Sequence, residues 1–207
     1  YRNLLNKFFY KNNTREDKKI FNSISKFAPK DLGFVWNKFS KKFTLCIYKD
    51  YKYIKWRYES CPFQKYSFLI FRDSKKKLLG LSIIRFQKTS YGECARIVDF
   101  ISLPKYEKKI WDETINICVK KNVLFIDFIV VGTAQDKNLF SSGFLLADDK
   151  NNLNKIPNLL SPIEYRDWSY SFHIGGYLAK KTNWNFKNKV WFTKGDGDRD
   201  WPTPNDI

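Results

Sequence analysis

The feature that most limits how this chain can fold is the pattern of residues 66–131, where three apolar strand-like segments precede one amphipathic helix and a further apolar segment. Turn residues at 73–76 and 91–93 separate the three segments, which predicts an antiparallel three-stranded unit over 66–102. Apolar residues at helical spacing then predict a helix over 104–121. This order indicates a mixed α/β fold built on one sheet.

The segment Val123–Val131 is a nearly continuous apolar run that only Asp127 interrupts. Such a run is typical of a strand buried on both faces, in a central or parallel position. A short helix is predicted over 136–142, and further strands over 170–178 and 184–193.

The residues before the sheet are expected to be helical. Thr14 can cap a helix that starts at Arg15 and that Pro29 ends. A second helix is predicted from about residue 48 to residue 58, because Ile47, Tyr51, Ile54 and Tyr58 fall on one helical face. We therefore divide the chain into a basic helical extension, 1–42, and a main domain, 43–207.

The composition favours a folded protein that does not span a membrane. Apolar residues make up 43% of the 207 residues, enough for a sizeable core, and no apolar run reaches the roughly 18 residues of a membrane span. Four irregularly spaced cysteines and one histidine argue against a zinc site and a disulfide framework, so we expect a reducing cytoplasm. The chain begins at Tyr1 and contains no Met, which we interpret as a fragment or processed form with room for a further domain before Tyr1.

Positive charge is concentrated near the start of the chain. The net charge is +17, and residues 1–60 hold 15 Lys and Arg against 5 Asp and Glu. A basic, aromatic segment of this kind can bind nucleic acid, an anionic membrane or a phosphorylated ligand. The alternative is a solvated surface of a Lys- and Asn-rich chain, and since no nucleic-acid motif is present, nucleic acid is the less favoured partner.

Three phrases occur in a fixed order: Trp56-Arg57-Tyr58 with Pro62 close behind, Arg96-Ile97-Val98-Asp99-Phe100, and the stretch Trp191 to Asp198. Together with the order of elements, they resemble the GCN5-related N-acetyltransferase (GNAT) superfamily. The likeness is greatest to the GNAT-like proteins of bacterial surface-polysaccharide biosynthesis. It covers about residues 43–198 and implies a GNAT-like fold, with the three-stranded meander at 66–103, the cofactor-binding helix at 104–121 and a splayed strand at 123–132.

The resemblance also implies an activity, the transfer of an acyl group from acetyl-CoA or another acyl-CoA to an amine. The acceptor would be a nucleotide-linked or lipid-linked amino-sugar. The coenzyme diphosphate would lie at the start of the helix, where Lys105, Lys108 and Lys109 could attract it. The turn departs from the family pattern, because residues 103–109 contain no glycine and Pro104 lacks an N–H group. Residues 135–142 also lack the tyrosine that many members use as an acid.

Two carboxylates are candidate catalytic residues. Asp99 lies among apolar strand residues, where a raised pKa would suit a general base, and it falls near the acidic base of the family. The alternative is a structural Asp paired with an arginine such as Arg96. Asp127 interrupts a buried strand and is either functional or a satisfied buried polar residue.

The substrate-binding candidates come from the first and last phrases. Trp56, Arg57 and Tyr58 could line an acceptor pocket, since aromatic rings stack on sugars and Arg pairs with phosphate or carboxylate; the alternative is a core role. Asp196 and Asp198 could contact the acceptor or form a structural turn. No metal is expected, because Trp201 and Ile207 occupy the calcium-loop positions of glycine and glutamate. His173 fits a structural role better than a catalytic one.

Three hypotheses remain open: an acyltransferase, a non-catalytic GNAT-like module that binds a partner or a carbohydrate, and a nucleic-acid-binding protein that uses its basic N-terminal third.

Overall fold

A five-stranded, mostly antiparallel sheet forms the centre of the molecule. The computed structural model describes residues 19–89, 91–132, 136–145, 159–161, 164–165 and 190–197. Only the last pair of strands in the sheet is parallel. In spatial order the strands are β1 (Phe21–Ser25), β3 (Ser67–Arg72), β4 (Leu78–Thr89), β5 (Gly92–Ser102) and β6 (Ile126–Phe128).

A second, three-stranded sheet continues from the parallel edge. After β6 the chain passes through Ile129 into β7 (Val130–Val131), which pairs with β10 (Val190–Thr193) and no longer with β5. The strand β2 (Leu45–Cys46) pairs with the other edge of β10. A separate small pair is formed by β8 (Leu159–Ser161) and β9 (Glu164–Tyr165).

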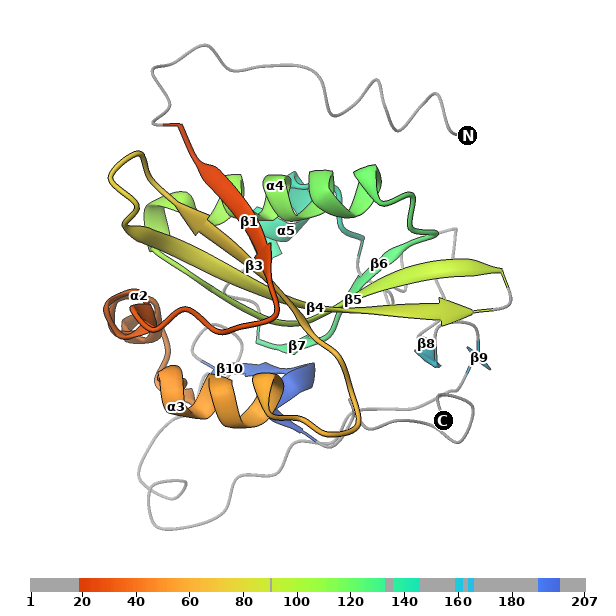
Figure 1. Cartoon of the computed structure of the whole chain (residues 1–207), viewed down its shortest axis with the longest axis horizontal. Coiled ribbons are helices and arrows are strands. Elements are labelled where there is room, and N and C mark those ends of the chain that lie inside the picture. Colours follow the sequence, from red (N-terminus) through yellow and green to blue (C-terminus); the bar gives the residue numbers. More distant parts are fainter. Residues whose placement is uncertain are drawn as a thin grey trace.

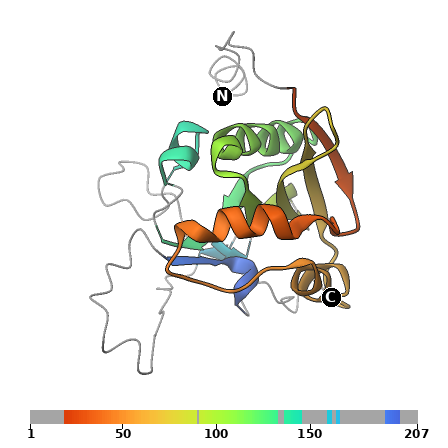
Figure 2. The ribbon, with the colours of Figure 1, turned by 90° about the vertical axis from the view of Figure 1, so that its left-hand side faces the viewer.

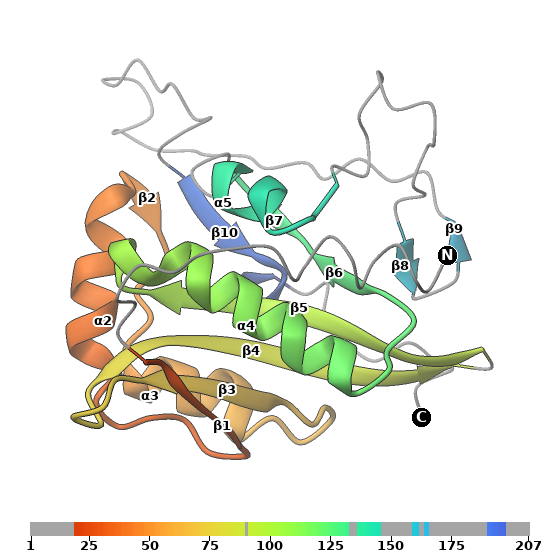
Figure 3. The ribbon, with the colours of Figure 1, turned by 90° about the horizontal axis from the view of Figure 1, so that it is seen from above.

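Helices cover both faces of the five-stranded sheet (Figures 1 and 3). One face carries α4 (Glu107–Lys120), which follows the turn η3 (Pro104–Tyr106), with α5 (Asp136–Ser141) beside it. The opposite side carries α2 (Leu32–Phe39) and α3 (Tyr51–Ile54), and Figure 2 shows α2 crossing the molecule next to β10. The short turns η1 (Ser40–Lys42), η2 (Lys55–Glu59) and η5 (Lys194–Asp196) complete the described elements.

The sheet and α4 pack closely because small and large side chains alternate at their contact. Trp111 stacks on Phe100 with ring centroids 3.9 Å apart. Gly80 lets α4 approach, since a Cβ there would lie 2.5 Å from Cδ1 of Ile110. Ser82 and Thr114 satisfy each other by a buried hydrogen bond of 3.0 Å. This contact fixes α4 over β4 and β5, the strands that carry the polar clusters described below.

The central expectation, a mixed α/β fold with one helix after a three-stranded unit, is confirmed. The strands β3, β4 and β5 lie within the predicted 66–102, and η3 with α4 occupies the predicted 104–121. The next strand, β6, is parallel to β5, in agreement with the central or parallel position that the apolar run predicted. The short helix expected at 136–142 is α5. The described helices are all too short or too polar to cross a bilayer.

The helix expected from Arg15 to Pro29 is wrong in its described part. Residues 21–25 form β1, which pairs antiparallel with β3 from Phe21 opposite Arg72 to Ser25 opposite Phe68. Backbone pairing with a distant strand therefore overrides the local helical spacing. The helix α2, absent from our predictions, buries Leu32, Val35, Trp36 and Phe39, so residues 21–42 share their core with the later elements.

The apolar run Val123–Val131 is not buried on both faces. Its strand residues are half-buried, and the run divides into β6 in one sheet and β7 in the other. Because the two sheets diverge here, neither strand has neighbours on both sides along its whole length. The expected helix at 48–58 begins later, at Tyr51, and α3 continues after Ile54 as the π-helical turn η2, which ends at Glu59.

Candidate functional site

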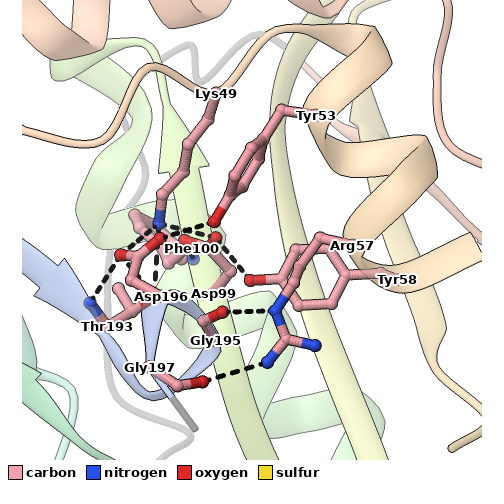
Figure 4. Close-up of polar contacts among 10 residues, drawn as sticks. All are labelled: Lys49, Tyr53, Arg57, Tyr58, Asp99, Phe100, Thr193, Gly195, Asp196 and Gly197. Atoms are coloured by element: carbon pink, nitrogen blue, oxygen red, sulfur yellow. Dashed lines mark hydrogen bonds and ion pairs between the residues drawn. The ribbon is translucent and has the colours of Figure 1, made fainter. Parts of the chain in front are cut away.

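A fully buried lysine joins segments that lie far apart in the sequence. Lys49 precedes α3, whose N-cap Asp50 accepts a 2.8 Å hydrogen bond from the backbone N–H of Tyr53. The Nζ atom of Lys49 donates to Oδ2 of Asp99 and to Oδ2 of Asp196, both at 2.7 Å (Figure 4). These partners are 50 and 147 residues away. The ammonium thus ties the start of α3 to β5 and to η5.

Two tyrosines donate to the same carboxylates. The hydroxyl of Tyr58 lies 2.8 Å from Oδ2 of Asp99, and the hydroxyl of Tyr53 lies 3.2 Å from Oδ1 of Asp196. Burial, followed by the nearby carboxylates, raises the pKa of both hydroxyls. Both tyrosines therefore remain protonated donors at neutral pH.

A π-helical turn determines which of the side chains of Trp56, Arg57 and Tyr58 point toward the cluster. In η2 the N–H of Ser60 donates to the carbonyl oxygen of Lys55, five residues earlier. Such turns insert one extra residue per turn and are frequent at functional sites. Arg57 and Tyr58 both turn toward the cluster, whereas Trp56 is 67% exposed.

Arg57 holds the backbone of the last phrase. Its Nε donates to the carbonyl oxygen of Gly195 at 2.7 Å, and its Nη2 donates to that of Gly197 at 3.2 Å. Within this phrase, Asp196 accepts from the backbone N–H of Thr193 at 2.8 Å, which closes a capping box at η5. The turn is therefore held by contacts of its own and by Lys49, Tyr53 and Arg57.

A β-bulge sets the direction of Asp99. Ile83 pairs with Asp99 while Ile84 pairs with Ile97, so Val98 is the extra residue of β5. In a regular strand, residues 96 and 99 would point to opposite faces. The bulge reverses this, because Arg96 pairs with Arg85, two residues from Ile83 on the same face of β4.

The charges of this cluster do not balance. One ammonium lies between two carboxylates, and all three side chains are nearly inaccessible to solvent. Burial raises the pKa of Asp99, Lys49 partly offsets this, and Asp196 adds to the rise. Oδ1 of Asp99 accepts from the N–H of Phe100 at 2.9 Å, and Oδ2 accepts from Lys49 and Tyr58. Each oxygen of Asp99 therefore has a donor.

The cluster lies where β5 and β6 diverge. The two strands pair only from Ala95 to Ile97, and no described strand pairs with this edge of β5 beyond that point. The turn after β10 spans the gap. The N–H of Lys194 donates to the carbonyl oxygen of Ile129 at 3.0 Å, while Asp196 reaches Asp99 through Lys49.

A second polar cluster lies farther along the same face. Arg96 donates from Nε and Nη2 to Oδ2 of Asp127, at 3.0 and 2.9 Å. Arg96 and Arg85 also both donate to Oε1 of Gln87. Oδ1 of Asp127 is buried and has no hydrogen-bond partner within the described part of the chain, although the side chain as a whole is 20% exposed.

The start of α4 does not fit the diphosphate of an acyl-coenzyme A. Glu107 places a buried carboxylate in the first turn, where it pairs with Lys42 and accepts from Asn138 at 2.9 Å. Lys108 is held by Asp112, and Pro104 supplies no N–H group. A carboxylate lies at the start of α4, and residues 103–109 contain no glycine. The chemistry proposed below therefore does not depend on coenzyme A bound at α4.

The structure thus brings together Arg57, Tyr58, Asp99 and Asp196 among the predicted site residues. It leaves Trp56 outside the cluster and places Asp127 in the second cluster. Of the three predicted lysines, Lys105 lies in η3, and Lys108 and Lys109 lie in the first turn of α4. Asp198 and His173 lie outside the described residues. No group of acidic, Cys or His residues in the described part could hold a metal ion.

Sequence reasoning missed Lys49, Tyr53 and Thr193. The chain has 38 Lys and Arg residues, so nothing local distinguishes Lys49 from the others. The N-cap Asp50 was the one usable signal, because it predicts a helix start directly after Lys49 and would have shifted the predicted boundary.

Comparison with known proteins gives a distant likeness only. No protein-family model matches the chain, and no curated protein matches it. A solved structure of an acetyltransferase from Trypanosoma brucei aligns with 66% of this chain and 99% of its own, with 11% identical residues and a TM-score of 0.38. We draw no residue role and no substrate from a likeness this distant.

Proposed function

We propose that this protein transfers an acyl group to an amine and that the buried Lys49–Asp99–Asp196 cluster belongs to its active site. One observation carries the proposal. The three phrases that suggested GNAT proteins each contribute a side chain, Tyr58, Asp99 and Asp196, to one cluster at the divergence of two strands.

The free-energy cost of burying these three charged side chains supports a functional role for the cluster. Burying two carboxylates with one ammonium is rarely the most stable solution, since well-packed apolar residues often do as well or better. Titratable groups with raised pKa values at a break in a sheet are candidates for function. A raised pKa suits Asp99 to accept the proton that the amine loses when it forms the amide bond.

Access to Asp99 is part of the proposal. Because Asp99 is fully buried, an acceptor can reach it only when the turn at 193–197 moves. Lys49, Tyr53 and Arg57 are side chains that hold this turn. The exposed ring of Trp56, beside that of Tyr53, is then the aromatic surface available to an acceptor.

The proposal also includes the chemical class of the acceptor and of the donor. An amino-sugar acceptor of surface-glycan synthesis, nucleotide-linked or lipid-linked, rests on the resemblance of the three phrases. The donor is an acyl thioester, and the structure offers no diphosphate turn for coenzyme A at α4.

The test is an acetyl-transfer assay that follows thiol release, with glucosamine as the amine and N-acetylglucosamine as the blocked control. Two donors are compared, acetyl-coenzyme A and S-acetyl-N-acetylcysteamine. The decisive variants are Asp99→Asn and Asp196→Asn, since each leaves Lys49 with one carboxylate and so brings the buried charge into balance.

We expect Asp99→Asn to reduce turnover by roughly 10²-fold or more, as for removal of a general base, with the fold retained. Asp196→Asn should reduce it less. Equal and small effects of the two variants would mean that the cluster only stabilises the fold.

A second candidate function is a non-catalytic GNAT-like module. It is favoured by the saturated hydrogen bonding of Asp99 and by the carboxylate at the start of α4. Absence of turnover with both donors, in a folded protein, would make this module the better description.

A further inference from the structure

We propose that Glu107 is a built-in anion that closes the start of α4 to diphosphate groups. The donor in the proposed acyl transfer is then an acyl thioester whose carrier places no diphosphate at this helix. The statement about the donor rests on the proposed function, whereas the closure of the helix start is a property of the folded chain alone.

Glu107 is buried and its carboxylate has polar partners from two other elements. Its side chain is only 4% exposed although it lies in the first turn of a surface helix. Lys42, from the turn after α2, pairs with one carboxylate oxygen. Asn138 of α5 donates to the other oxygen at 2.9 Å. Three elements therefore converge on one carboxylate.

The position of Glu107 at the start of α4 determines its effect on the binding of anions there. A helix start carries roughly half a positive charge from its free N–H groups, which attracts anions. Here a carboxylate of the chain already lies in that field, and Lys42 already balances it. A diphosphate would bring further negative charge beside a buried carboxylate, and like charges at this range repel.

The neighbouring lysine is also committed to an internal partner. Lys108 donates to both oxygens of Asp112, at 2.7 and 2.6 Å. Asp112 in turn accepts from the hydroxyl of Ser142 at 2.8 Å. These bonds link α4 to the end of α5, so Lys108 serves the helix packing. With Pro104 at the preceding turn, the backbone supplies one N–H fewer to any phosphate.

The test uses inorganic pyrophosphate and coenzyme A as probes, titrated calorimetrically into the full chain near pH 7. The variant Glu107→Gln removes the charge and keeps the shape, which leaves Lys42 without its counter-ion. The matched control is Glu113→Gln, which removes the same charge from the same helix six residues later. In the described part of the chain, Glu113 accepts a hydrogen bond from the side chain of Asn22.

We expect the unaltered chain and Glu113→Gln to bind both probes equally weakly. Glu107→Gln should bind both at least about tenfold more tightly, a difference of about 1.4 kcal/mol. Two outcomes would overturn the proposal: saturable binding by the unaltered chain that matches Glu107→Gln, or no gain in Glu107→Gln while circular dichroism shows a native fold.

The acyl-transfer assay separates this inference from the proposed function. If the donor carries no diphosphate at α4, acetyl-coenzyme A and S-acetyl-N-acetylcysteamine should react with similar kcat/KM, and a large preference for the coenzyme would count against the inference. If neither donor reacts, the proposed function fails, and the pyrophosphate titration still decides the role of Glu107.

Discussion

At the scale of single residues, Lys49 connects the charged groups of the first polar cluster. It is the shared counter-ion of two buried carboxylates, and its ammonium also lies 3.2 Å from the hydroxyl of Thr193. Breaking a buried ion pair by removing one partner is far more costly than replacing the whole set, because the remaining charge keeps its desolvation penalty.

Lys49→Met should therefore lower the free energy of unfolding at neutral pH by about 3–5 kcal/mol, since two carboxylates remain buried with no cation. Urea unfolding measures this directly. The control is Lys52→Met in α3, three residues after Lys49, where the residue is exposed and the change should stay within about 0.5 kcal/mol. Equal effects of the two variants would contradict the buried role of Lys49.

The raised pKa of Asp99 predicts a pH dependence of stability. The folded state holds the Asp99 proton more tightly than the unfolded chain, whose ordinary value is 3.8. The contribution of Asp99 to stability is therefore greatest at low pH and is lost as pH rises through the folded pKa. Relative to the unaltered protein, Asp99→Asn should gain stability as pH rises from 4 to 7. Urea titrations across that range test this, and a constant difference would contradict it.

At the scale of elements, the structure depends on close contact between η5 and the π-helical turn. Gly195 lies against the hydroxyl of Tyr58 with no room for a side chain. The same hydroxyl donates to Asp99, so the contact couples backbone packing to the polar cluster. Local sequence does not reveal this requirement, because the two turns are joined only in the folded molecule.

Gly195→Ala should lower the free energy of unfolding by about 1–3 kcal/mol, as expected for overpacking. The added Cβ would lie 1.9 Å from the hydroxyl oxygen of Tyr58. Gly33→Ala provides a control of opposite sign, because nothing lies within 4 Å of that Cβ inside α2, and a helical alanine is favoured by about 0.5–1 kcal/mol. Thermal unfolding of both variants distinguishes a steric effect from a general effect of alanine.

At the scale of the whole molecule, an aromatic cluster joins the two sheets. Trp191 of β10 contacts Phe39 of α2, Phe43 and Phe128 of β6, with ring centroids 5.2–6.0 Å apart. Phe128 in turn contacts Trp111 of α4. One core thus includes residues from Ala28 to Trp191, so we expect the described part to unfold as one unit.

Trp191→Ala should reduce the free energy of unfolding by about 3–5 kcal/mol, as for other large buried aromatic residues. Near-ultraviolet and far-ultraviolet circular dichroism should report the same lowered midpoint. Trp56→Ala is the control, because its exposed ring should change stability by no more than about 0.5 kcal/mol. A lower midpoint seen by the near-ultraviolet signal alone would show that β10 unfolds separately.

The sequence predicted those features of the fold and of the site that depend on residues close together in the chain. Alternating and helical spacings predicted β3, β4, β5 and α4, and the apolar setting of Asp99 indicated a perturbed carboxylate. Three features appear only in the tertiary structure: residues 21–25 form a strand, the bulge at Val98 turns Asp99 and Arg96 to one face, and Lys49 is the counter-ion of both Asp99 and Asp196. The difference lies in the sequence separation of the residues that interact. Periodicity records which face of an element is buried. By contrast, the pairing of β1 with β3 and the ion pairs of Lys49 join residues that are distant in the sequence, 50 and 147 positions apart for Lys49, and no local pattern encodes such contacts.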